Sequence, residues 1–235
     1  MRNLKKVMLQ ITDIPTEQTT AATDVFLAIL AFIITVKIYL SGKGVDLKKA
    51  RIWIWVFGLL TFASVIGAYA HGFKMSKLTN YVLWQPLNLS LGLAVGLFAA
   101  GVVYDFKNFT LPKAMIPVVL ICAIIFYTIT VIFPNALAVF IICEAILMLF
   151  ALVAYTILAS RKTIKGAGLM AAGILVTIIA AVIQAIKATK IIFIREFDHN
   201  GIFHIVQMIG LIILLKGLQT EFKSRANQFK ARSRG

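Results

Sequence analysis

The sequence has few charged residues and few acidic ones. Of its 235 residues, 14% are charged and nine are Asp or Glu, whereas a typical soluble domain has about 25% charged residues. Hydrophobic residues make up 60% of the chain, and the mean hydropathy is +0.93. This composition argues against a soluble globular domain, a disordered chain and a nucleic-acid-binding domain. It favours an all-α, polytopic membrane protein.

Cysteine is also scarce, and the two cysteines show no pattern of a disulfide framework. Cys122 and Cys143 each lie inside an apolar run and far from any Cys-x-x-Cys motif. Disulfide frameworks use more cysteines, placed in polar loops. We therefore expect both residues to be small apolar side chains buried among helices.

Long hydrophobic runs dominate the rest of the chain. A membrane-spanning helix needs about 20 mostly apolar residues, and seven segments qualify: 22–40, 52–72, 82–104, 112–133, 135–158, 167–191 and 201–219. A tight hairpin is expected at Pro134–Asn135, between the fourth and fifth segments. The predicted organisation is a polar lead-in at 1–20, a seven-helix bundle at 21–220 and a basic tail at 221–235.

The distribution of basic residues predicts the orientation of this bundle. The 24 Lys and Arg residues give a net charge of +15, and about twice as many fall on one side of the predicted membrane as on the other. Because basic loops favour the cytoplasm, we expect the N-terminus outside the cell membrane and the C-terminus in the cytoplasm. Contact with anionic lipid headgroups, rather than with nucleic acid, explains the basic tail.

Polar residues inside membrane segments are costly, so each is a candidate for function. With alternating helices, most of them fall in one layer near the outer ends, and this layer includes all three histidines. Its members are Asp24, His71, Gln85, Asn88, Gln184, His199, Asn200, His204 and Gln207. Glu144 lies about two turns deeper, and we expect it to support the site or to line a channel for the substrate.

The histidines predict a metal site. Neutral imidazoles with a carboxylate are the usual ligands of a catalytic zinc, which activates a bound water near neutral pH. We therefore predict His71, His199 and His204 as zinc ligands, with Asp24 as catalytic base or fourth ligand. Two ordinary alternatives stay open. His199 fits a solvated loop, and Thr23 with Asp24 fits a cap of the first helix.

Two of these positions resemble those of a known family. Seven spans with His71 ending the second, in Gly-Ala-Tyr-Ala-His, and His204 opening the seventh, in Asn-Gly-Ile-Phe-His, resemble the alkaline ceramidase and progestin-receptor-like (PAQR) superfamily of membrane hydrolases. The resemblance implies a zinc held by one histidine of the second helix and two of the seventh. Asn200 stands where the family has another histidine, and Gly67 where it has a serine, with Ser64 three residues earlier.

Three functions remain open from the sequence. The first is a zinc-dependent hydrolase of lipid amide or ester bonds in the outer leaflet. The second is a non-enzymatic receptor, ligand-binding protein or small transporter, whose polar layer forms an outward-facing pocket. The third is a structural membrane protein with an incidental polar rim. The chain would also fit a separate membrane family whose site joins Asp24, His71, His199, Asn200 and His204.

Overall fold

The computed structural model describes residues 10–133, 137–186, 191–192 and 195–232. In this part of the chain, seven helices are long and apolar enough to cross a membrane. They are α1 (Pro15–Gly42), α2 (Leu47–Gly72), α3 (Lys77–Phe106), α4 (Met115–Ile132), α5 (Leu137–Ser160), α6 (Ala167–Ile186) and α7 (His199–Arg232). The chain is therefore a multi-pass integral membrane protein.

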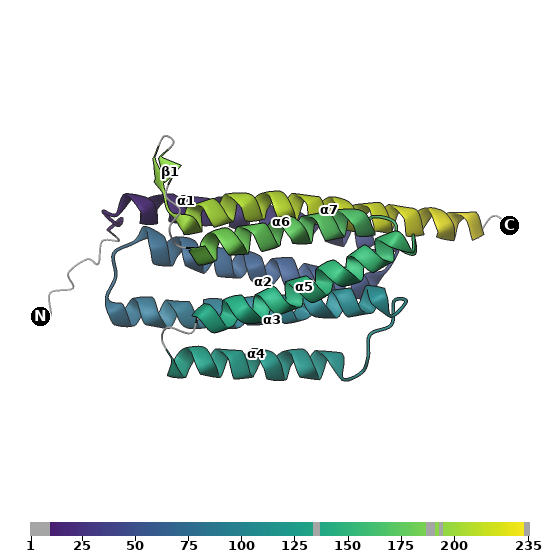
Figure 1. The fold of residues 1–235 in the computed structure, drawn as a ribbon, viewed down its shortest axis with the longest axis horizontal. Coiled ribbons are helices and arrows are strands. Elements are labelled where there is room, and N and C mark those ends of the chain that lie inside the picture. The colour runs from purple at the N-terminus through teal and green to yellow at the C-terminus, as the bar shows by residue number, and fades with distance from the viewer. Residues whose placement is uncertain (1–9, 134–136, 187–190, 193–194, 233–235) are drawn as a thin grey trace, which may run out of the picture.

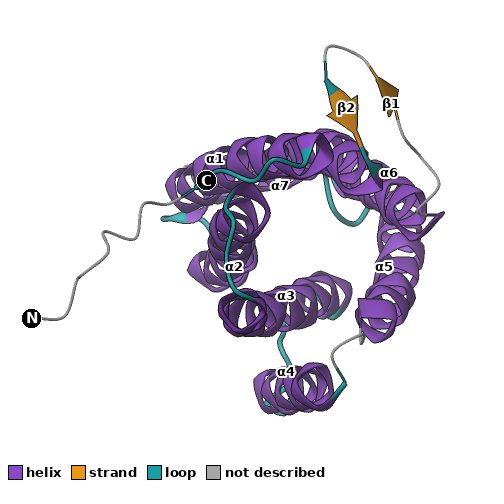
Figure 2. Cartoon of the chain, turned by 90° about the vertical axis from the view of Figure 1, so that its left-hand side faces the viewer, coloured by secondary structure: helices purple, strands orange, loops and turns teal. Residues whose placement is uncertain are grey.

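Six of the helices form a ring. Figure 2 looks along the bundle and shows α1, α2, α3, α5, α6 and α7 around a central space, with α7 closing the ring against α1. The helices run alternately up and down, as Figure 1 shows. At one end, which we call the N-terminal end, α1, α3, α5 and α7 begin. We call the opposite end, beyond which α7 projects, the C-terminal end.

The helix α4 lies outside this ring and packs on α3 (Figure 2). Glycines on α3 make the close approach possible. A Cβ at Gly92 would lie 2.7 Å from Phe126, and a Cβ at Gly96 would lie 2.8 Å from Val119. Small residues let helices pack closely in lipid, where apolar burial alone does not drive association. One wall of the bundle is therefore two helices thick, while its neighbour, α5, has no helix outside it in Figure 2.

The observed helix ends differ from the predicted segments. The predicted lead-in at 1–20 overlaps α1, which already begins at Pro15, because proline is well tolerated in the first turn of a helix. The predicted tail from 221 onward is helical as far as Arg232. Its first two residues, Glu221 and Phe222, are buried, so the bundle extends beyond the apolar run that defined the seventh segment.

The sixth segment was predicted to run to residue 191, but the described α6 ends at Ile186. A short antiparallel hairpin follows, formed by β1 (Ile191–Ile192) and β2 (Glu196–Phe197). Residue 191 therefore lies in a strand and not in a helix, because β-branched residues are apolar enough for a membrane helix and also favour strands. Residues 187–190 and the hairpin predicted at Pro134–Asn135 lie outside the described residues.

The expectation that both cysteines are buried is wrong. Cys122 and Cys143 are exposed on the surface of the bundle as free thiols. The outer surface of a membrane helix is as apolar as the protein core, because it faces lipid chains. An apolar run therefore cannot distinguish a buried cysteine from a lipid-facing one.

Candidate functional site

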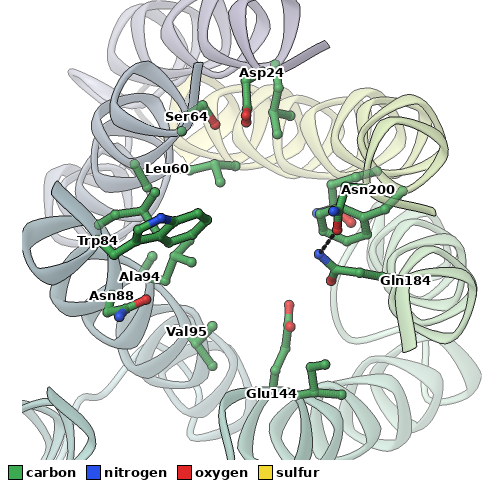
Figure 3. Close-up of a pocket in the computed structure, with 18 of the residues that line it drawn as sticks. Asp24, Leu60, Ser64, Trp84, Asn88, Ala94, Val95, Glu144, Gln184 and Asn200 are labelled. Atoms are coloured by element: carbon green, nitrogen blue, oxygen red, sulfur yellow. Dashed lines mark hydrogen bonds between the residues drawn. The ribbon is translucent and has the colours of Figure 1, made fainter. Parts of the chain in front are cut away.

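A cavity of about 1240 Å³ lies inside the ring, and all seven helices contribute to its wall. Figure 3 shows part of its lining, with side chains from several helices directed at a common space. Nine of the ten predicted site residues line this cavity: Asp24, His71, Gln85, Asn88, Glu144, Gln184, Asn200, His204 and Gln207. The tenth, His199, is not among the lining residues. The alternation of helix directions therefore does bring these polar groups together.

The cavity is polar near the N-terminal end and apolar in its depth. Along α3 the lining runs from Lys77 to Phe98, about 32 Å at 1.5 Å per residue. The deeper lining is apolar: Val56, Phe57, Leu60, Leu91, Ala94, Val95, Phe98, Met148, Leu211 and Leu214. The cavity thus has the polarity of an amphiphilic molecule, with one polar end and one apolar end.

The cavity also reaches the side of the bundle. Its lining includes Phe126, Thr130 and Phe133 at α4, although α4 stands outside the ring (Figure 2). Ile142 of α5 lines it as well and is 60% exposed. The cavity therefore extends between α3 and α5 toward the lipid-facing surface.

Asp24 and His204 face one another across α1 and α7. His204 Nε2 lies 3.4 Å from Asp24 Oδ1, and its Nδ1 lies 2.9 Å from Thr23 Oγ1. A Cβ at Gly67 would lie 2.9 Å from an oxygen of Asp24, so the glycine makes room for this carboxylate. Because α1 begins at Pro15, Asp24 lies well inside the helix, and the alternative of a helix cap is wrong.

His71 has a different partner, which the sequence did not indicate. Its Nδ1 lies 2.5 Å from Oε2 of Glu17, in the first turn of α1. Its ring packs edge-on against Trp84, with 5.5 Å between the ring centroids. His71 is therefore held in place by α1 and α3. Glu17 could have been noticed as one of only nine acidic residues, but its contact depends on how α1 and α2 pack.

The start of α7 is fixed by Asp198. Its Oδ1 accepts hydrogen bonds from the backbone amides of Asn200 and Gly201 and from Thr20 Oγ1, each at 3.0 Å. This is the geometry of a helix cap, and it ties α7 to α1. Asn200 in turn accepts a hydrogen bond of 3.2 Å from Nε2 of Gln184 (Figure 3).

Only two of the predicted zinc ligands lie side by side. Asp24 lies beside His204, whereas His71 lies beside Glu17, which was not predicted, and His199 does not line the cavity. Among the described residues, no group of three or more His, Cys, Asp and Glu side chains lies close enough to hold a metal ion. The zinc site therefore stays a prediction, and so do the roles assigned to these residues.

Three other groups of the cavity wall lack partners within the described residues. Gln85 Oε1 and Gln207 Oε1 are buried without a hydrogen bond. The Gln85 amide is oriented by Nε2, which donates to the carbonyl oxygen of Tyr81 at 3.2 Å. The carboxyl group of Glu144 points toward the middle of the cavity (Figure 3). It makes no hydrogen bond or ion pair with a described residue.

The C-terminal end holds a second polar cluster, which sequence reasoning missed. Lys49 Nζ donates to both carboxylate oxygens of Asp105 at 2.8 Å and also pairs with Glu221. Tyr155 OH donates to Asp105 Oδ2 at 2.7 Å. The side chains of Lys49 and Asp105 are 0% exposed. Four helices, α2, α3, α5 and α7, therefore meet at one buried ion pair.

Asp46 extends this cluster to the surface. It accepts hydrogen bonds from Tyr104 OH at 3.0 Å, from Arg225 Nη1 at 2.5 Å and from the backbone amide of Lys49 at 3.0 Å. We call this cluster, made up of Asp46, Lys49, Tyr104, Asp105, Tyr155, Glu221 and Arg225, the ion network. It joins helices at the C-terminal end, and pairing among its own members satisfies most of its charges.

Residues 19–221 match the model of a family described as a family of unknown function, DUF6962. The chain belongs to this family. The match begins within α1 and ends in α7, so it spans the cavity and every residue of the ion network except Arg225. No curated protein and no solved structure matches the chain, and the comparisons show no link to the alkaline ceramidase and PAQR superfamily.

Proposed function

We propose that this DUF6962 protein binds an amphiphilic molecule inside the membrane and works as a non-enzymatic receptor, ligand-binding protein or small transporter. The shape and polarity of the cavity carry this proposal. Its volume of about 1240 Å³ exceeds the roughly 300–1,000 Å³ of common ligand pockets. A polar head fits the N-terminal end, and an alkyl chain fits the apolar depth.

The side opening between α3 and α5 gives such a ligand a route from the membrane. An amphiphile dissolved in the bilayer would keep its chain in an apolar environment along this whole path. The polar end of the cavity lies near the helix ends, where the headgroup region of a bilayer begins. With the orientation predicted from the basic residues, this end faces outside.

A photoreactive alkyl probe tests the proposal. Dodecanol carrying a diazirine on its chain would be added to protein in phosphatidylcholine nanodiscs, irradiated, and mapped by peptide mass spectrometry. We expect saturable labelling of peptides that contain Trp84 and Phe98, and competition by unmodified dodecanol. Labelling that never saturates and falls only on lipid-facing residues would contradict the proposal.

A pair of variants on α3 separates the cavity from the outer surface. Val95 faces the cavity (Figure 3), whereas Val82 lines no part of it and is 56% exposed. Val95→Trp fills part of the apolar depth and should weaken saturable labelling by about tenfold, as expected for about 1.4 kcal/mol of lost binding free energy. Val82→Trp introduces the same side chain on the same helix and should leave labelling unchanged.

A zinc-dependent hydrolase is the second candidate. Asp24, His71 and His204 all line the cavity, and Nε2 of His204 lies 3.4 Å from Oδ1 of Asp24. Glu17 contacts only Nδ1 of His71, which is compatible with zinc on Nε2, because a zinc-bound histidine commonly donates its other ring N–H to a carboxylate. Elemental mass spectrometry of purified protein tests this candidate, with His71→Ala and His204→Ala beside the wild type. One zinc per chain, lost in both variants, would favour hydrolysis. Zinc-free protein that takes up none on addition would exclude it.

A further inference from the structure

Three acceptor groups of the cavity wall have no hydrogen-bond partner within the described residues. They are the carboxyl group of Glu144 and the amide oxygens of Gln85 and Gln207. Gln207 is only 9% exposed, and its Oε1 has no partner among the described residues. A buried acceptor without a donor costs about 1–3 kcal/mol, and more if it is charged. The two amide oxygens are buried, so Glu144, whose carboxyl group points into the cavity (Figure 3), is the acceptor that a ligand can reach.

These three acceptors lie at similar distances from the starts of their helices but at different depths in the bundle. Gln85 is eight residues from the start of α3, Gln207 is eight from the start of α7, and Glu144 is seven from the start of α5. At 1.5 Å per residue these distances are about 10–12 Å. Because α3 begins farther out at the N-terminal end than α5 and α7 (Figure 1), Gln85 lies nearer the rim, and Glu144 and Gln207 lie deeper, next to the apolar part of the cavity.

The lysine and histidine side chains of the lining do not pair with Glu144. His204 lies between Thr23 and Asp24, and His71 is paired with Glu17. Gln184 donates to Asn200. Lys77, the first residue of α3, is exposed and marks the rim of the cavity, eight residues above Gln85. The positive charge that would match Glu144 must therefore come from the ligand.

We propose that the ligand carries a cationic head of the ammonium class, with Glu144 as its counter-ion. This inference rests on the proposed function and narrows its ligand. An ammonium group supplies N–H donors and a positive charge and has no acceptor, which complements the carboxylate of Glu144. Glu144 accepts from the head directly or through water, and the alkyl chain extends along the apolar lining toward Phe98 and Leu214.

Two probes that differ only in their heads test this inference. Dodecylamine and dodecanol would carry the same diazirine, and their half-saturating concentrations for labelling the Trp84 and Phe98 peptides would be measured in neutral nanodiscs. We expect dodecylamine to bind at least about tenfold more tightly, which corresponds to about 1.4 kcal/mol. This comparison uses the wild-type protein and so does not depend on how any variant folds.

Matched carboxylate variants then locate the counter-ion. Glu144→Gln keeps the size of the side chain and should bring dodecylamine to within about twofold of dodecanol, whose own binding stays unchanged. Glu17→Gln removes a carboxylate at the same end of the bundle that does not line the cavity, and it should leave the preference for the amine intact.

The outcomes separate this inference from the proposed function. Equal binding of both probes, or a preference for the amine that survives Glu144→Gln, would overturn the assignment of a cationic head at Glu144 while amphiphile binding stands. Failure of both probes to label the cavity saturably would overturn the proposed function and this inference together. Loss of the amine preference in Glu144→Gln, with the preference kept in Glu17→Gln, would support both the inference and the proposed function.

Discussion

The two ends of the bundle treat polar groups in opposite ways. At the C-terminal end, the charges of Lys49 and Asp105 are 0% exposed and fully paired. At the N-terminal end, Glu144 faces the cavity without a partner among the described residues, and the amide oxygens of Gln85 and Gln207 are also unpaired. Buried polar networks stabilise a fold when they are satisfied and are costly when they are not. The paired end therefore closes the bundle, and the unpaired end is available to a ligand.

The ion network and the cavity wall should therefore have different roles, the first in folding and the second in ligand binding. The ion network joins helices that are distant in sequence, since Lys49 and Glu221 belong to α2 and α7. Its loss should affect folding. Glu144 joins no helices to one another, so its replacement should affect ligand binding and leave folding nearly unchanged. The following variants test this division, beginning with the largest expected effect.

Replacing Lys49 by Ala should strongly destabilise the protein. The change leaves the carboxylates of Asp105 and Glu221 buried without their shared cation, and breaking a buried ion pair costs about 3–5 kcal/mol. The free energy of unfolding would be measured by denaturation in mixed micelles. Lys48→Ala is the control, because Lys48 is the exposed neighbour in the same turn, and it should change stability by less than about 0.5 kcal/mol. Equal losses in both variants would contradict a structural role for the network.

Replacing Tyr155 by Phe should have an intermediate effect. The variant keeps the aromatic ring, which is fully buried, and removes only the hydroxyl that donates to Asp105 at 2.7 Å. A hydrogen bond to a charged group contributes about 1.5–3 kcal/mol. Tyr69→Phe removes a hydroxyl from a side chain that is 37% exposed and should be nearly neutral in the same assay. A Tyr155→Phe variant with the same free energy of unfolding as the wild type would show that Lys49 alone satisfies Asp105.

The sequence predicted the seven helices because each apolar run is long enough to span a bilayer, and the described part of the chain contains seven such helices. Helix ends were harder to predict, since polar residues continue a helix wherever a neighbour packs against them. Residues 221–232 illustrate this. They read as a basic tail, yet Phe222 is buried against the bundle and α7 continues to Arg232.

The candidate site shows a similar division. The depth of a residue along each helix could be estimated by counting residues from the helix ends. Nine of the residues chosen in this way line one cavity. The face of a helix could not be estimated, because an apolar run has no polar side to orient it. Lys49 shows the consequence, since nothing in the run Lys48–Arg51 distinguishes the one lysine that is buried. Partners such as Glu17 for His71 depend on packing that the sequence does not state.

Replacing Glu144 by Gln should have the smallest effect on stability, within about 0.5 kcal/mol in either direction. No described residue loses an ion pair or hydrogen bond, and a neutral amide costs less to place inside a membrane than a carboxylate. The same denaturation assay that reports Lys49→Ala would measure it, in the absence of added ligand. A loss as large as that of Tyr155→Phe would mean that Glu144 supports the fold, and the contrast between a paired end and an unpaired end would then fail. Near-neutral stability together with a lost preference for dodecylamine would place the role of Glu144 in binding alone.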